Sequence, residues 1–185
     1  MHDRSSWRLG RRPTVVRLAR SDRLRIAGSR RPHRLGELLA DPSLTLPLAV
    51  DVKDGRAIAQ VVDALRAARA LGSSRVWCRS TRAVAWAAQV AAPAEIALLR
   101  NTRGAAATMR YLDDASGVGA AAVSLHQDAV TAAVVARAHS LGLVAYAWVV
   151  QADGHARVLA AGVDGVVTDW PRIALAELLR QGERC

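Results

Sequence analysis

The chain has 185 residues, of which 51% are hydrophobic and 23% charged, and its formal net charge at pH 7 is +10. This length suits one domain with a sizeable core. No apolar run approaches the roughly 20 residues that a membrane span needs, so the sequence excludes an integral membrane protein and predicts a soluble one.

The positive charge is concentrated at the N-terminus. Residues 1–35 hold eleven arginines against Asp3 and Asp22, and so account for nine of the ten net positive charges. This segment lacks interleaved aromatic side chains, and the chain shows no zinc-finger or glycine-loop pattern, which disfavours nucleic-acid binding. A basic segment that screens a phosphate-bearing substrate, or a solvated flank, is favoured.

The first residues contain no apolar segment of the kind that follows the charges of a secretory signal peptide, so a cytoplasmic location is expected. Cys78 and Cys185 are the only cysteines and lie outside any metal-ligand spacing. Because disulfides are rare in the cytosol, a buried thiol and an exposed terminal thiol are expected.

In chain order, residues 1–34 are predicted to be an Arg-rich loop or arm with one short β-like run at 14–18, and residues 35–185 a single domain. A short helix is expected over 35–39. An alternation of apolar β-branched runs and amphipathic segments follows. It predicts strands over 46–53, 75–78, 96–99, 121–125, 142–150 and 162–168, and helices over 56–71, 81–90, 105–112, 128–141 and 173–179, with Gly72 ending the first of these helices.

Six strands that alternate with helices indicate parallel βα units, arranged as an open doubly wound sheet or as part of a barrel. Polar residues follow almost every strand, which favours the barrel, because a (β/α)₈ barrel builds its site at these ends. They are Asp51, Lys53, Cys78, Ser80, Arg100, Asn101, His126, Trp148 and Asp169. The predicted fold is therefore a partial (β/α)₈ barrel with about six units.

The segment 138–171 carries the strongest motif. Its ordered set of residues resembles the C-terminal signature of the glycerophosphodiester phosphodiesterase family: Ala138, His139, Gly142, Trp148, Gly162, Val163, Asp164, Gly165, Thr168, Asp169 and Pro171. Val149 and Gln151 depart from it, standing where the family usually has Thr and Asn.

Weaker similarities extend the resemblance to the N-terminus. His2-Asp3 resembles a His-Asp dipeptide of the family, residues 35–39 resemble the helix that follows it, and Asp51-Val52-Lys53 resembles a Glu-x-Lys strand end. The family has two earlier βα units, with a His-Arg-Gly and a Glu-x-Asp motif, which have no counterpart here. The resemblance therefore implies a barrel that lacks its first two units and a chain with little or no activity.

The resemblance also implies roles for the remaining residues. His2 would be the general acid, Asp51 a ligand of a divalent cation, Ca²⁺ or Mg²⁺, and Lys53 a phosphate contact. Asp51 is one methylene shorter than the usual Glu, which alters the ligand geometry. The alternative for Asp51 and Lys53 is an ordinary ion pair at a strand end.

Two more strand-end residues are candidates for substrate binding. Trp148 would pack against a glycerol or lipid-derived group, or would be a core indole. His126 ends a strand at the same rim, although the family pattern does not fix it.

The predicted function is metal-assisted hydrolysis of a glycerophosphodiester to glycerol 3-phosphate and an alcohol, a phosphoric diester hydrolase step of lipid metabolism. A non-catalytic barrel remnant that binds phosphate is the alternative, and a basic nucleic-acid-binding protein is a further one. Strands 46–53 and 162–168 would be exposed parallel edges, through which the chain would oligomerise.

Overall fold

The computed structural model describes residues 5–7, 13–15, 34–44 and 46–182. The chain divides into two units, one made of residues 1–46 and 63–70 and the other of residues 47–62 and 71–185. The predicted boundary between residues 34 and 35 stays a prediction. None of the described helices is long and apolar enough to cross a membrane.

The first unit contains a small hairpin and a short helix. Strands β1 (Ser5–Trp7) and β2 (Pro13–Val15) pair antiparallel, with Ser5 opposite Val15. Helix α1 (Leu35–Leu39) was expected at these residues. Its first turn is closed by the carboxylate of Glu37, which accepts a hydrogen bond from the backbone N–H of Arg34 at 3.1 Å.

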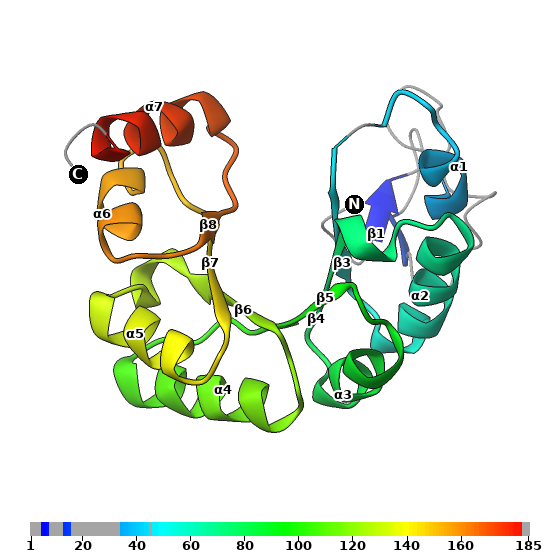
Figure 1. Ribbon diagram of the computed structural model, residues 1–185, viewed down its shortest axis with the longest axis horizontal. Helices are drawn as coiled ribbons and strands as arrows, with labels where there is room; N and C mark the ends of the chain where they lie inside the picture. Colours follow the sequence, from blue (N-terminus) through cyan, green and yellow to red (C-terminus); the bar gives the residue numbers. More distant parts are fainter. Residues whose placement is uncertain (1–4, 8–12, 16–33, 45, 183–185) are drawn as a thin grey trace. The chain divides into compact units, whose positions relative to one another are not determined.

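The second unit is built on a six-stranded parallel sheet in the order β3-β4-β5-β6-β7-β8, which is also the order along the chain. The sheet is curled like part of a (β/α)₈ barrel, and the crossover helices α3 to α6 lie on one side of it (Figure 1). The fold class predicted from the sequence is confirmed. The strands are β3 (Leu48–Val52), β4 (Ser74–Cys78), β5 (Glu95–Leu99), β6 (Ala122–His126), β7 (Val144–Trp148) and β8 (Gly165–Val166).

Each predicted helix is present; the bounds of α1 and of the helix over 81–90 are as predicted, and those of the other helices differ. The α-helices are α2 (Ile58–Ala67), α3 (Thr81–Val90), α4 (Ala105–Gly117), α5 (Ala132–Ser140), α6 (His155–Ala160) and α7 (Pro171–Gly182). Short 3₁₀ turns are η3 (Gly55–Ala57), η4 (Leu71–Ser73) and η5 (Gln127–Ala129).

Local chemistry explains several of these ends. The hydroxyls of Ser80 and Thr131 cap α3 and α5 by accepting the N–H groups of Ala83 and Val134. The prediction that Gly72 ends the helix after β3 is wrong. Arg69 takes the left-handed conformation there, with φ of 56°, and the N–H of Ala70 donates to the carbonyl of Leu65, a Schellman arrangement.

The two faces of the sheet differ because side chains alternate along each strand. One face, here called the inner face, carries an apolar cluster of Trp77, Ala97, Leu99 and Ala122, on which Val144, Tyr146 and Val167 pack. The other face holds side chains with almost no solvent exposure that pack under the helices, among them Val76, Leu98, Val123, Leu125 and Ala145. Helices bury one face of the sheet, and apolar side chains partly cover the other. Polar side chains therefore lie mainly at the ends of the strands.

Polar side chains also join the sheet at the amino ends of its strands. The guanidinium of Arg75 donates to the hydroxyl of Tyr146 at 2.9 Å and lies 3.2 Å from the carboxylate of Glu95. The Tyr146 hydroxyl in turn donates to Glu95 at 3.1 Å. These bonds link β4, β5 and β7 on the inner face, below the apolar cluster.

Candidate functional site

The candidate site lies at the carboxyl ends of the parallel strands. Val52 and Cys78 are opposite each other in the last register pair of β3 and β4, so Lys53 and Arg79 follow at the same level. Asp51 is opposite Trp77, and alternation places Asp51, Lys53 and Arg79 on the face of Trp77, which is the inner face. This is the edge where a barrel of this kind holds its site.

Lys53 and Asp51 form an ion pair on β3. The two side chains keep 42% and 31% of their surface exposed, so water screens their attraction and the pair contributes little to stability. The next carboxylate along the chain, Asp54, accepts a hydrogen bond from the N–H of Arg56 and pairs with its guanidinium at 2.7 Å. Both carboxylates near the end of β3 therefore have a basic partner.

Trp148 is held in a defined orientation at the end of β7. Its indole N–H donates to the carbonyl of Ser124 at 3.1 Å. The ring of His126 meets the indole edge-on, with the centroids 5.8 Å apart and the planes at 81°. Trp148 is half-buried, so part of a ring held in a defined orientation remains accessible.

His126 has one nitrogen occupied. Its Nδ1 accepts a hydrogen bond from the backbone N–H of Asp128 at 3.3 Å, which caps η5. In the neutral imidazole the proton is then on Nε2, since one ring nitrogen accepts and the other donates. Nδ1 also lies 3.4 Å from the carboxylate of Asp128, and the His126 side chain is 22% exposed.

Arg79 was not predicted to be a site residue. Its guanidinium carbon lies 5.9 Å from the centroid of the Trp148 ring, within the range of a cation–π contact. The side chain is exposed. The sequence contained one signal for it, since Arg79 is two residues beyond Trp77 on the same strand path and so shares its face.

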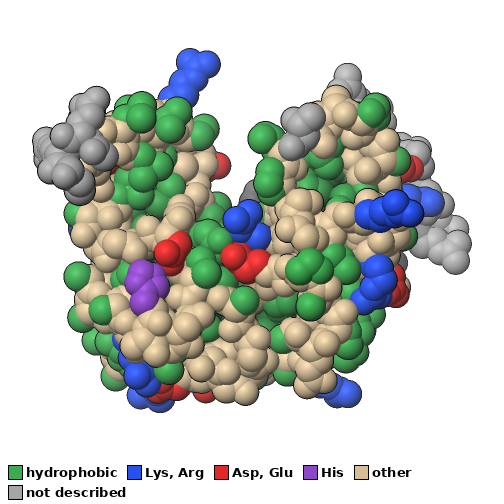
Figure 2. Space-filling model, in the orientation of Figure 1, with side chains coloured by type: hydrophobic (Ala, Val, Ile, Leu, Met, Phe, Trp, Pro, Cys, Tyr) green, Lys and Arg blue, Asp and Glu red, His purple; other side chains and the backbone are tan. Residues whose placement is uncertain are grey.

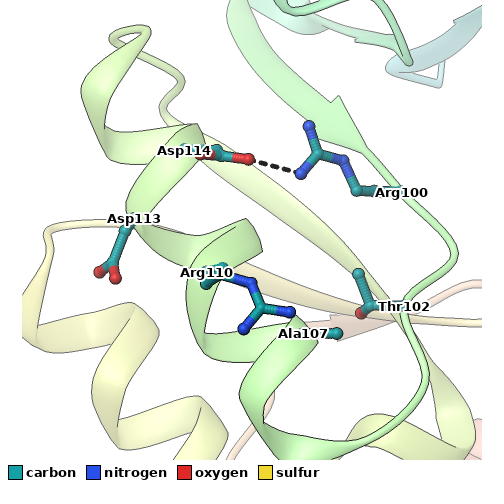
Figure 3. Close-up of a pocket in the computed structure, with 6 residues that line it drawn as sticks. All are labelled: Arg100, Thr102, Ala107, Arg110, Asp113 and Asp114. Carbon is teal, nitrogen blue, oxygen red and sulfur yellow. Dashed lines mark hydrogen bonds and ion pairs between the residues drawn. The ribbon is translucent and has the colours of Figure 1, made fainter.

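Other strand-end residues point elsewhere. The thiol of Cys78 is buried on the opposite face, and burial raises its pKa. Arg100 turns to α4, where it pairs with Asp114 at 2.6 Å (Figure 3). Its guanidinium also lies over the Tyr111 ring, 5.5 Å from the centroid. It borders a pocket of about 340 Å³ between the end of β5 and α4, also lined by Thr102, Ala107, Arg110 and Asp113. These two residues of the predicted rim are therefore not part of the site.

The described residues do not by themselves fit a divalent cation. Such ions take six or more oxygen ligands, usually including several carboxylates. Within residues 5–7, 13–15, 34–44 and 46–182 no group of three or more His, Cys, Asp or Glu side chains is placed to hold a metal. Asp51 alone supplies one carboxylate, and His2 lies outside the described residues.

The sequence was compared with models of known protein families. The model of the glycerophosphoryl diester phosphodiesterase family matches residues 45–173, more than half of the chain. The chain belongs to this family. Members of the family are generally metal-dependent phosphodiesterases. No curated protein matches the sequence.

Solved structures of this family share the fold. A putative glycerophosphoryl diester phosphodiesterase from Silicibacter pomeroyi DSS-3 superposes with a TM-score of 0.68 at 22% identity, covering 80% of this chain and 57% of its own. A glycerophosphodiester phosphodiesterase from Parabacteroides distasonis gives 0.72 at 15% identity, covering 86% and 69%. The Oleispira antarctica phosphodiesterase, solved with the product sn-glycerol-3-phosphate, gives 0.52 at 14%, covering 67% and 49%. The chain thus spans 57% of the length of the first of these phosphodiesterases.

Two residues of the sequence motif shared with the family, Asp164 and Thr168, make hydrogen bonds that stabilise the fold. Asp164, just before β8, accepts a hydrogen bond from the N–H of Ala145 at 2.7 Å and contacts the Nε2 of His139 at 2.9 Å. Burial acts to raise the pKa of Asp164, but these two contacts outweigh it and the pKa lies below its ordinary value. Asp164 thus joins α5, β7 and β8 at the amino ends of the strands, away from the candidate site.

The end of the motif holds the loop after β8. The Thr168 hydroxyl donates to the carbonyl of Val150 at 2.8 Å and accepts the N–H of Trp170 at 3.0 Å. The Thr168 hydroxyl oxygen also lies 3.0 Å from Nε2 of His155, a residue that is 1% exposed. His155 was not predicted, because the sequence does not distinguish a buried histidine at the start of a helix from an exposed one.

Proposed function

We propose that this chain binds a glycerophosphodiester at the carboxyl ends of β3, β4, β6 and β7 and takes part in its hydrolysis to glycerol 3-phosphate and an alcohol. The observation that carries the proposal is the placement of Lys53, His126 and Trp148 at one edge of the sheet. A phosphodiesterase of the same fold was solved with sn-glycerol-3-phosphate, which supports a small phosphate-bearing substrate.

Each side chain has a role that follows from its chemistry. The ammonium of Lys53, now bound to Asp51, would exchange this partner for a phosphate oxygen. Nε2 of His126 would donate a second hydrogen bond to the phosphate. The fixed indole of Trp148 would cover the carbon skeleton of the glycerol or of the alcohol.

The cation and the general acid complete the proposal. Ca²⁺ or Mg²⁺ would neutralise the phosphoryl oxygens, with Asp51 as one of its ligands and His2 as the acid that protonates the leaving group. Because the described residues supply one carboxylate, which Lys53 already engages, we expect this chain to hydrolyse its substrate weakly or not at all. Catalytic groups that act as a unit fail together.

The ion pair of Asp51 favours a second candidate, a phosphate-binding barrel without catalysis. A carboxylate neutralised by an adjacent ammonium does not need a metal to balance its charge. The third candidate, nucleic-acid binding, has less support. On the face drawn in Figure 2, acidic side chains lie beside basic ones at several places, and residues 36–185 carry a net charge of only +1.

The test uses the fact that Lys53 is the only lysine of the chain. Reductive methylation with ¹³C-formaldehyde labels its amine and the N-terminal amine, and gives two resolvable NMR signals. We expect glycerol 3-phosphate to shift the Lys53 signal saturably while the N-terminal signal serves as the internal control. Lys53→Ala should weaken binding measured by calorimetry roughly tenfold, the range of a hydrogen bond to a charged group.

Hydrolysis is measured in the same samples with Ca²⁺, with Mg²⁺ and with EDTA, on the native chain and on Asp51→Ala. Metal-dependent turnover that Asp51→Ala abolishes would support the enzyme. Binding without turnover would favour the phosphate-binding candidate. A Lys53 signal that does not respond to the ligand would refute both.

A further inference from the structure

The end of β4 carries a charge that the proposed reaction does not use. Lys53 is neutralised by Asp51, whereas no carboxylate among the described residues contacts Arg79. Within this part of the chain, the one interaction described for the Arg79 guanidinium is with the Trp148 ring. Among the described residues, the rim therefore has an exposed guanidinium beside the indole that no described carboxylate neutralises.

The position of the Arg79 guanidinium matters because an indole face is itself a binding surface for cations. Trp is the best aromatic partner for cations, and aromatic faces are the common recognition surface for quaternary ammonium groups. The indole of Trp148 is held in this orientation by its hydrogen bond to the Ser124 carbonyl and by the edge-on contact with His126. Arg79 fills the cation site on this ring with a group of the protein itself.

We infer that Arg79 selects substrates by the charge of their alcohol. The site prefers a glycerophosphodiester whose alcohol bears a further negative charge over one whose alcohol is cationic. This inference rests on the proposed function and deepens it. A choline group meets a like charge and an occupied aromatic face. An alcohol with a second phosphate instead gains an opposite charge from a guanidinium, whose planar fork suits phosphate oxygens.

The expected effect is moderate, because the rim is solvated. An exposed charge pair changes an affinity by roughly two- to fivefold, and the two ligand classes respond in opposite directions. The ratio of affinities for bis(glycerophospho)glycerol and glycerophosphocholine should therefore favour the former by at least roughly fivefold. It should fall as salt is added, as expected for an exposed charge.

The experiment measures dissociation constants by calorimetry for glycerol 3-phosphate, glycerophosphocholine, glycerophosphoglycerol and bis(glycerophospho)glycerol. It compares the full native chain with Arg79→Gln, Arg79→Lys and Arg110→Gln. Arg110 is exposed on α4 in the pocket of Figure 3 and gives a control with the same change of net charge. Circular dichroism establishes that each variant is folded.

We expect Arg79→Gln to bring the affinity ratio close to one, by weakening the anionic ligand and strengthening the choline ester. Arg79→Lys should keep the preference in part, because it keeps the charge, and Arg110→Gln should leave it unchanged. If the native chain binds the choline ester as well as the anionic one, or if Arg110→Gln changes the ratio as much as Arg79→Gln does, the inference is wrong while the proposed function stands. If no ligand binds, glycerol 3-phosphate included, both are wrong.

Discussion

Tyr111 of α4 offers the sharpest test of how the site is supported. Its side chain has no exposed surface, and its hydroxyl donates to the carbonyl of Leu98 on β5 and accepts the N–H of Ser124 on β6. Burial raises the pKa of Tyr111, so the hydroxyl stays protonated and able to donate at neutral pH. The hydroxyl therefore joins two strands where α4 crosses them.

Tyr111→Phe removes this bridge and leaves the shape of the side chain almost unchanged. The Leu98 carbonyl and the Ser124 N–H then lose a partner in a buried place, at about 1–3 kcal/mol each. Allowing for some relaxation, we expect a loss of about 3 kcal/mol in the free energy of unfolding. For a chain of this size this corresponds to roughly 6–12 °C in melting temperature.

The assay is urea unfolding of the native chain and the variant, with the slope of the transition checked for constancy. Tyr146→Phe is the matched control, because its half-buried hydroxyl bonds Arg75 and Glu95, and its loss should cost about 1 kcal/mol or less. Since the Ser124 carbonyl accepts the Trp148 indole N–H, the fluorescence of Trp148 should also change in Tyr111→Phe. Equal losses for the two tyrosines, or a loss under about 1 kcal/mol for Tyr111→Phe, would refute the bridge.

Two further predictions concern the amino ends of the strands. A Cβ at Gly165 would lie 2.8 Å from two ring carbons of Tyr146, so Gly165→Ala should cost about 1–3 kcal/mol in thermal or urea unfolding. Gly117→Ala, with nothing within 4 Å of its Cβ, should be neutral or slightly stabilising, and equal effects at both glycines would contradict the packing argument. Because the pKa of Asp164 is lowered in the folded protein, its ionised carboxylate stabilises the fold at a pH above its ordinary pKa of 3.8. This stabilisation is lost as the pH falls through the lower pKa of the folded state. Asp164→Asn should therefore unfold more easily than the native chain at pH 6, by less than about 1 kcal/mol given its exposure, and the difference should shrink in melts at pH 3; a difference independent of pH would count against the linkage.

The order and type of the elements in the second unit could be predicted from the sequence, because apolar alternation and the Ser80 and Thr131 caps are local signals. The ends of most other elements could not, although the helices over 35–39 and 81–90 begin and end where predicted. The strand predicted from residue 142 begins at Val144, because Gly142 has a φ of 73° and closes the preceding turn. The strand predicted over 162–168 also starts later, at Gly165, because Gly162 has a φ of 86°, and it ends at Val166.

The candidate site was predictable only in part, because local sequence patterns do not show which side chains from distant strands contact one another. The polar ends of β3, β6 and β7 could be found from strand order alone. That Lys53 engages Asp51, and that Arg79 lies over Trp148 on a strand 69 residues away, depends on the curl of the sheet. Arg100 shows the opposite error, since a strand-end position did not reveal that its side chain turns to α4.

The contacts that hold the sheet and those that would meet a ligand are separated along the strands. Asp164, Gly165 and the link from Arg75 to Tyr146 act at the amino ends. Lys53 and Arg79 lie at the carboxyl ends, where their exposed side chains contact Asp51 and Trp148 among the described residues. Substitutions at these two rim positions therefore have little thermodynamic cost to overcome. A library randomised at Lys53 and Arg79 should therefore consist mostly of folded proteins, so both positions can be varied without loss of the sheet.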